Sequence, residues 1–226
     1  MFRVPSFKLS YKSTKVIESE ALNLSEGVHI ILGANGSGKS STLKYLAGLL
    51  PDSNKRYFDK GQDCLYLPPT SELHPELFVL DLLDIFNLPE KLVSESYFKI
   101  DHLANKRLSE CSSGELQRIL LSCYLKQNKQ VLLLDEPTNF LDPRFEKILA
   151  QEILSLSASK CILIASHQLS WLSHFLSQPA LFFHNRQISS FDSLENLVQS
   201  PEMETAFELK IQLLPHPNYN SKVITY

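Results

Sequence analysis

The sequence Gly33-Ala-Asn-Gly-Ser-Gly-Lys-Ser40 is the most informative part of this chain. It matches the pattern GxxxxGK[ST] of a phosphate-binding loop. The 226 residues include only 7 glycines, and three of them stand in this short stretch. A loop that wraps a phosphate closely and points backbone N–H groups inward excludes Cβ atoms at several positions. We therefore expect this loop to hold the phosphates of a nucleotide.

The residues on either side of the loop fit the same interpretation. Val28–Leu32 is a short apolar run typical of a buried strand, and residues 40–50 predict a helix with one apolar face. The N–H groups and the dipole at the start of that helix favour an anion. Lys39 would place its charge on the β- and γ-phosphates, and Ser40 would offer its hydroxyl to Mg²⁺. The alternative is a plain strand, turn and helix with an incidental lysine.

More apolar runs farther along the chain predict buried strands at residues 131–134, 161–165 and 180–183. Between them lie stretches with the spacing of amphipathic helices. One helix is expected to start after Asp142 as N-cap, with Pro143 in its first position. Strands separated by helices imply a mostly parallel sheet that is covered by helices.

Residues 70–110 differ from the rest, because they carry helical patches and no convincing strand. We expect a helical insertion at about 70–125 and a short C-terminal tail at about 200–226, with one β-like run at 223–225. No repeat, low-complexity tract or linker divides the chain. The expectation is a single domain over residues 1–226.

Two acidic residues, Asp135 and Glu136, follow the strand predicted at 131–134. Ligands of open α/β sheets bind at the carboxyl ends of the strands, so both acids are expected beside the phosphate loop. Asp135 has the position of an acid that holds Mg²⁺ through water. Glu136 could reach a water in line with the γ-phosphate and act as general base. The alternative is a solvated acidic strand end.

The stretch Cys111-Ser-Ser-Gly-Glu-Leu-Gln-Arg118 resembles the signature motif of the ABC ATPases, usually written LSGGQ and followed by a helix with QR. Small residues at a second helix N-terminus offer another phosphate site. Ser-Ser-Gly-Glu is also a common N-cap sequence. Its place upstream of the acidic pair favours the signature interpretation.

Three further features are similar to the ABC family. Residues 137–142 resemble its D-loop. His167 stands after a predicted strand, where the family keeps its switch histidine, although a lone histidine is more often structural. Tyr11 stands where the family stacks an aromatic ring on adenine, and the alternative is a packing residue in an edge strand.

The resemblance covers essentially the whole chain. It implies an α/β fold of the P-loop NTPase type with an ABC-type core, a small antiparallel β subdomain at the N-terminus and the helical insertion. It also implies an ATPase with ATP and Mg²⁺ as cofactors, Glu136 and His167 as catalytic residues, and Ser40 and Asp135 as Mg²⁺ ligands. The residues expected to bind ATP are Tyr11, Gly33, Ala34, Asn35, Gly36, Ser37, Gly38, Lys39, Ser40, Ser41, Ser112, Ser113, Gly114, Glu115 and Asp142.

The family resemblance further implies a head-to-tail homodimer, or a pair with another ATPase domain. In such a dimer the signature Ser112–Glu115 of one copy closes on ATP held by the loop of the other. The closing and reopening movement would be passed to an integral membrane permease. The helical insertion is expected to carry the signature and to face that permease.

The sequence departs from the family pattern in two places. The signature differs at Cys111, Ser113 and Glu115. In the Q-loop, Tyr66-Leu-Pro-Pro-Thr70 lies where the family has an apolar pair, Pro and then Gln, so Pro69 takes the Gln position. Proline has no side-chain donor or acceptor and stiffens the hinge. We expect hydrolysis and coupling to be altered unless Thr70 or Gln62 fills the role.

The tail indicates a subgroup. Residues 200–212 look like the end of the ATPases that power ferric-siderophore, haem and vitamin B12 importers, where a short helix ends in Phe-Gly or Tyr-Gly. Here Phe207 is followed by Glu208, so the match is partial. We expect the ATPase subunit of a metal-chelate importer. The alternatives are the ATPase of an exporter, and a soluble ABC protein that acts on ribosomes or DNA.

Composition limits the remaining possibilities. A net charge of −3 and a pI near 6.2 give no basic excess for nucleic acid, which is not an expected partner. No apolar stretch approaches the roughly 20 residues that span a bilayer, and the first residues lack the apolar region of a secretory signal. The four cysteines form no metal-ligand pattern and are expected to be reduced, buried thiols. We expect a cytoplasmic protein, peripheral on the inner face of the cell membrane.

Overall fold

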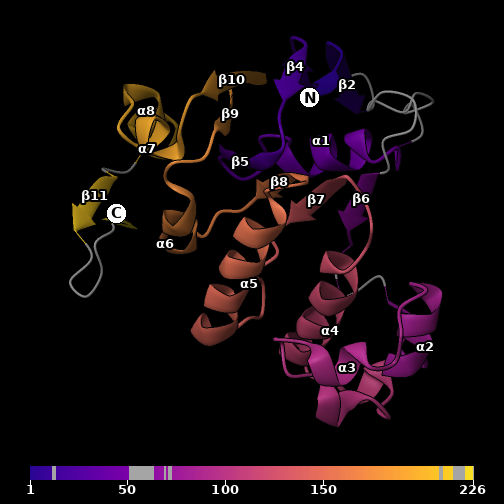
Figure 1. Ribbon diagram of the computed structural model, residues 1–226. Helices are drawn as coiled ribbons and strands as arrows, with labels where there is room; N and C mark the ends of the chain where they lie inside the picture. The colour runs from indigo at the N-terminus through magenta and orange to yellow at the C-terminus, as the bar shows by residue number, and fades with distance from the viewer. Residues whose placement is uncertain are drawn as a thin grey trace.

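The computed structural model of the protein describes residues 1–11, 14–50, 64–68, 70, 73–208, 211–215 and 222–225 (Figure 1). Its centre is an eight-stranded sheet with the strand order β2-β3-β10-β9-β5-β8-β7-β6. In that order the strands are Phe7–Tyr11, Thr14–Ser19, Gln187–Phe191, Ala180–His184, Gly27–Gly33, Cys161–Ala165, Val131–Asp135 and Cys64–Leu67. The run from β9 to β6 is parallel throughout, whereas β10 is antiparallel to β9 and β2 is antiparallel to β3. The predicted α/β fold with a mostly parallel sheet is confirmed, as are the four predicted strands.

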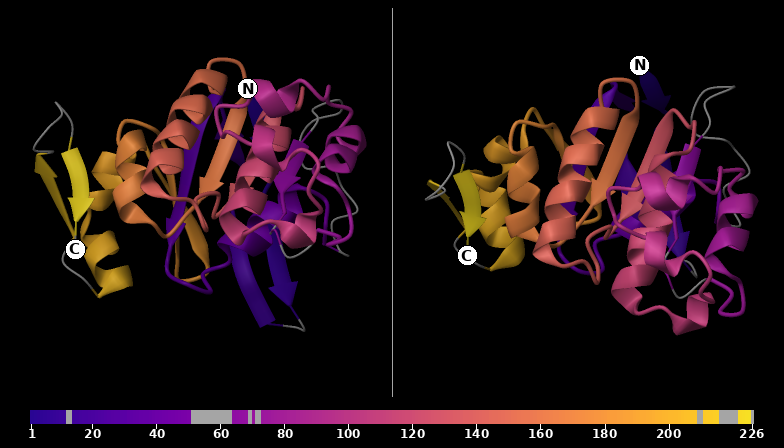
Figure 2. Two further views of the ribbon diagram at one scale, coloured as in Figure 1. Left: turned by 90° about the horizontal axis from the view of Figure 1, so that it is seen from below. Right: turned by 60° about the horizontal axis from the view of Figure 1, so that its bottom comes forward.

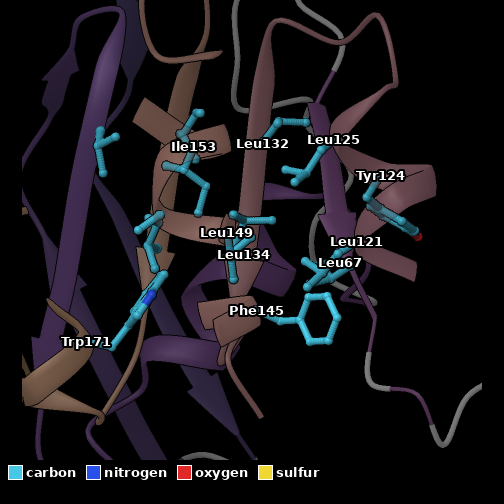
Figure 3. Packing of buried hydrophobic residues seen from close by; sticks show 14 of the residues in the cluster. Leu67, Leu121, Tyr124, Leu125, Leu132, Leu134, Phe145, Leu149, Ile153 and Trp171 are labelled. Carbon is cyan, nitrogen blue, oxygen red and sulfur yellow. The ribbon is translucent and has the colours of Figure 1, made fainter. Parts of the chain in front are cut away.

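The sheet is covered on both faces, which explains why β7 is apolar at successive positions. Leu132 and Leu134 of β7 point toward α4 (Ser113–Leu125) and α5 (Pro143–Leu156), which lie side by side on one face (Figures 2 and 3). Val131 and Leu133 belong to the core on the other face, which α1 (Lys39–Leu46) covers. Because successive side chains of β7 point to opposite faces of the sheet, this one strand contributes to both hydrophobic cores.

Two helices end earlier than the sequence pattern indicates. The helix predicted over 40–50 is α1, and it ends at Leu46 because Gly48 takes a left-handed conformation with φ of 74°. The helix predicted after the 161–165 strand is one short turn, α6 (Leu169–Leu172), continued by a 3₁₀ turn, η4 (Ser173–Phe175).

The segment between β6 and β7 is helical, and it gathers at one end of the molecule beneath β6 (Figure 1). It contains α2 (Val79–Ile85), α3 (Leu92–Glu95), the 3₁₀ turns η2 (Asp101–Leu103) and η3 (Leu108–Glu110), and α4. In the described part of 70–110 the only β-type pairing is an isolated bridge between Phe78 and Arg107. The division of the chain into domain, insertion and tail stays a prediction.

Two small antiparallel sheets stand outside the central one. The first pairs β1 (Phe2–Val4) with β4 (Leu22–Leu24) near the N-terminus. The tail has α7 (Leu194–Val198), α8 (Pro201–Phe207) and a hairpin of β11 (Gln212–Pro215) with β12 (Lys222–Thr225). The hairpin is tied to η4, because the Ile224 N–H donates to Ser173 Oγ at 2.8 Å.

In the part of the chain that the structure describes, none of the helices is both long and apolar enough to cross a bilayer.

Candidate active site

The loop that follows β5 owes its shape to glycines. A Cβ on Gly33 would lie 2.5 Å from the carbonyl oxygen of Phe183 in β9, closer than real Cβ contacts allow. Gly36 and Gly38 have φ angles of 76° and 102°, which side chains disfavour. Gly38 is also the N-cap of α1, which begins at Lys39. The backbone therefore turns directly from the end of the sheet into the start of a helix, as the phosphate-loop prediction requires.

Lys39 lies beneath this loop. Its side chain is buried, and Nζ donates to the carbonyl oxygens of Gly33 at 2.8 Å and Ala34 at 3.1 Å. Burial lowers the pKa of the Lys39 ammonium, while the charges of Glu136 and Asp135 act in the opposite direction. Ser37 Oγ is also buried and has no hydrogen-bond partner among the described residues. The loop thus holds a cation and an unsatisfied hydroxyl ready for an anion.

Asp135 ends β7 and is held by two hydroxyl groups. Ser40 Oγ donates to its Oδ1 at 3.0 Å, and Tyr66 Oη donates to its Oδ2 at 3.1 Å. Burial raises the pKa of Asp135 above its usual range, and the two hydrogen bonds oppose that rise. The pair that the sequence assigned to Mg²⁺ is therefore in contact. Tyr66 was not among the predicted site residues.

Glu136 and His167, the two predicted catalytic residues, also touch. The His167 Nδ1 lies 2.8 Å from Glu136 Oε2, and the His167 backbone N–H donates to the same oxygen at 3.2 Å. Glu136 has a left-handed φ of 48°, which is uncommon for a residue with a Cβ. Its own N–H donates to the Ala165 carbonyl oxygen of β8 at 2.8 Å. Strained backbone of this kind is concentrated at functional sites.

Ser40, Asp135 and Glu136 open onto one cleft of about 330 Å³ at the carboxyl edge of the sheet. Its lining consists of Ser40, Pro68, Thr70, Gln117, Asp135, Glu136, Asn139 and Phe140. Thr70, considered as a substitute for the Q-loop glutamine, is thus on the cleft. Pro69 and Gln62 lie outside the described residues.

Gln117 was missed as a site residue, although it belongs to the QR pair that follows the signature. Its buried side chain donates from Nε2 to the Pro137 carbonyl oxygen at 2.8 Å. This bond links α4 to the loop after Glu136. A buried polar residue on the apolar face of a predicted helix is the signal that could have found it.

The signature lies on a different hollow. Ser112 is the N-cap of α4: its Oγ accepts from the Glu115 N–H at 3.3 Å, and its N–H donates to Glu115 Oε2 at 2.8 Å. This hydrogen bond to the Ser112 backbone lowers the pKa of the Glu115 carboxyl. The hollow measures about 160 Å³, and its lining comprises Ser112, Gly114, Glu115, Arg118, Phe140, Leu141, Asp142 and Phe145.

Asp142 has a structural role at the start of α5. Its Oδ1 accepts from the N–H groups of Arg144 and Phe145 at 3.0 and 3.1 Å, which makes it the N-cap of α5 as predicted. It lies on the signature hollow, away from the lining of the larger cleft.

The remaining predicted contacts with ATP lie at the edges of the site. Asn35 and Gly36 are exposed on the loop, and Ser41 follows Ser40 within α1. Tyr11 ends β2, where its backbone pairs with Thr14. The Tyr11 side chain lies outside the described parts, so its role toward adenine stays a prediction.

The comparisons with known proteins point to one family. A family model described as ABC transporter matches residues 19–139. The cytochrome c biogenesis ATP-binding export protein CcmA of Reclinomonas americana is 32% identical over 176 residues, which cover 69% of this chain and 79% of that protein. The achromobactin transport ATP-binding protein CbrD of Dickeya dadantii is 25% identical over 243 residues, which cover 94% of this chain and 90% of that protein.

A solved structure shows the same fold. The ATP-binding subunit of an ABC transporter superposes with a TM-score of 0.73 at 19% identity, and the match covers 90% of this chain and 94% of that chain.

Proposed function

Because this chain belongs to the ABC transporter family, as an ATP-binding subunit that hydrolyses ATP, we propose that it powers the import of a metal chelate through a separate membrane permease. One observation supports the ATPase site: two acidic residues lie beside the phosphate loop, each held by a neighbouring side chain. Asp135 is hydrogen-bonded to Ser40, and Glu136 is in contact with His167. Two features support the cargo class. The tail resembles that of siderophore, haem and vitamin B12 importers, and the achromobactin transport protein is 25% identical over 94% of this chain.

ATP binding is the first step. The N–H groups of the loop and of the first turn of α1 would donate hydrogen bonds to the phosphate oxygens. The Ser37 hydroxyl, which has no partner among the described residues, could donate to them as well. Lys39 would exchange its bonds to the Gly33 and Ala34 carbonyl oxygens for bonds to phosphate oxygens. A charged donor gains more from a phosphate than from a neutral carbonyl.

Mg²⁺ fits the donors that stand beside the loop. A hydroxyl and a carboxylate are hard oxygen ligands of the kind that Mg²⁺ prefers. No cluster of three or more His, Cys, Asp or Glu side chains suited to a metal occurs among the described residues. That suits an ion held by one carboxylate and the substrate phosphates. When bound, Mg²⁺ supplies charge that stabilises the transferring phosphoryl group.

Hydrolysis requires a base beside the γ-phosphate. We assign that role to Glu136, which would take a proton from water as the water oxygen bonds to the γ-phosphorus and the bond to the β-γ bridging oxygen breaks. The two contacts from His167 fix one carboxylate oxygen of Glu136 and so orient the group. The products are ADP and inorganic phosphate.

The signature completes the site from another copy. Within one chain Ser112, Gly114 and Glu115 line a different hollow from the cleft beside the phosphate loop, and Phe140 is common to both linings. A head-to-tail dimer would bring the signature of each copy onto ATP held by the other. Closure on ATP and reopening after hydrolysis would drive the permease, with the chain on the cytoplasmic, inner face of the cell membrane.

The test is to capture the chain with its membrane partner from intact membranes and to identify that partner. Reconstituted in vesicles, the pair should hydrolyse ATP faster when a metal chelate is present and should accumulate the chelate. Outward movement of a substrate would favour an exporter, as the 32% identity to an export protein also allows. Capture of ribosomes or DNA without an integral membrane protein would contradict the transport proposal.

A further inference from the structure

We propose that Tyr66 is a positioning residue for the Mg²⁺-binding carboxylate, because its hydroxyl holds one oxygen of Asp135 while Ser40 holds the other. The two bonds are 3.1 Å from Tyr66 Oη to Oδ2 and 3.0 Å from Ser40 Oγ to Oδ1. This inference rests on the proposed function, in which Asp135 and Ser40 receive Mg²⁺ with ATP.

The sheet register brings Tyr66 to this place. The parallel strands β6 and β7 pair Tyr66 with Leu133. Asp135 lies two residues beyond Leu133, so its side chain leaves the same face of the sheet. That face is the one covered by α1, whose first turn carries Ser40. The phenol therefore crosses diagonally from β6 to the end of β7 and bonds Oδ2 of the carboxylate, while Ser40 of α1 bonds Oδ1.

Two donors on different elements restrict how the carboxylate can turn. Tyr66 is 7% exposed, so its ring is fixed by packing, and the Lys44 ammonium lies 5.9 Å from the ring centroid. A cation at this distance is attracted to the ring face, which adds to the packing that holds the ring. Because Oδ2 is occupied by Tyr66, Oδ1 is the oxygen turned toward the Ser40 hydroxyl. The acid is thus oriented by the chain itself.

Partners that orient a metal ligand change metal affinity or activity by about 10- to 100-fold when they are removed. A packing role would need only the ring of Tyr66, whereas a positioning role needs its oxygen. Tyr66→Phe separates the two, because it keeps the ring and removes the donor. The expected consequence is a weaker response to Mg²⁺ with ATP binding otherwise unchanged.

The experiment uses the full chain with Glu136→Gln, so that bound nucleotide is not consumed. Binding of a fluorescent ATP analogue is measured in EDTA and across a series of Mg²⁺ concentrations, with and without Tyr66→Phe. We expect equal affinity in EDTA, and a Mg²⁺ midpoint raised about 10-fold by Tyr66→Phe. Tyr124→Phe is the matched control: Tyr124 is equally buried, but its ring packs on Phe86 in the other core.

An unchanged Mg²⁺ midpoint in Tyr66→Phe, with normal Mg²⁺ dependence in the parent, overturns the inference and leaves the proposed function standing. A parent that binds ATP without any response to Mg²⁺ contradicts both. Tyr66→Leu, which also removes the ring, gives a second measurement and should shift the midpoint at least as far. A shift in Tyr66→Leu alone would assign the effect to the ring and overturn the role of the hydroxyl.

Discussion

Gly114 shows how a single position can require one residue type. A Cβ built on Gly114 would lie 2.7 Å from the carbonyl oxygen of Phe140. That oxygen belongs to the backbone, and Phe140 already has a left-handed φ of 65°, so the loop has little room to adjust. The glycine of the signature therefore serves packing within its own chain, in addition to any contact with a nucleotide.

We expect Gly114→Ala to lower the free energy of unfolding by about 1–3 kcal/mol, the usual range for overpacking. Denaturant unfolding of the full chain measures it. Ser113→Ala is the matched control on the neighbouring residue, and we expect a change within about 0.5 kcal/mol, as for most surface substitutions. Equal stability of the two variants would mean that the loop moves aside without cost.

The cysteines differ more than their sequence pattern indicates. All four were expected to be buried, but Cys64 and Cys111 are only half-buried, whereas Cys123 and Cys161 are fully buried. Burial raises the pKa of the Cys123 and Cys161 thiols to about 12. Because the thiolate is the reactive form, only about 1 in 10⁴ of such thiols is ionised near pH 8.

A thiol reagent at pH 8 should therefore modify Cys111 well before Cys123 or Cys161, which should react only after denaturant is added. Mass spectrometry of digested protein identifies the modified positions. Cys111→Ser should remove the fast modification at that site. Rapid labelling of Cys161 in the native chain would contradict the burial of β8.

At the scale of helices and strands, the features predicted correctly from the sequence are those with a local cause. The apolar run at 131–134 and the N-cap Asp142 with Pro143 both have local causes, and both were located correctly. The end of α1 was missed because its apolar spacing continues past Gly48, and the pattern was given more weight than the glycine. Tyr66 was missed for another reason: its partner Asp135 is distant in sequence, and only the pairing of β6 with β7 brings them together.

The N-cap of α5 gives a test at this scale. Asp142→Ala removes the acceptor of the Arg144 and Phe145 N–H groups, and we expect a loss of about 1 kcal/mol of stability. Thermal unfolding without nucleotide measures it. Asp142→Asn keeps an oxygen acceptor and should retain most of the stability. Equal destabilisation by both variants would show that the charge of Asp142, and not its hydrogen bonds, is what matters.

At the scale of the whole molecule, the two halves of the proposed ATP site face different hollows. Ser40 of the phosphate loop and Glu136 line one, and Ser112, Gly114 and Glu115 line the other. Phe140 lines both and is 64% exposed. In a single chain, a surface that a second copy would cover is expected to expose apolar side chains, and Phe140 between the two hollows is such a side chain. No local pattern could have predicted this arrangement, since it depends on how the helical segment sits against the core.

The dimer can be tested by blocking hydrolysis. Glu136→Gln removes the proposed base but keeps a side chain of the same shape, so turnover should fall by about 10²- to 10⁴-fold while ATP still binds. Bound ATP would then hold the signature of one copy on the loop of the other, and light scattering after size exclusion in saturating Mg²⁺ and ATP should report a dimer. Adding Lys39→Ala should return it to a monomer, because the cation beneath the loop is lost. If Glu136→Gln binds ATP with normal affinity and stays monomeric, the signature of this chain does not complete the site of a second copy.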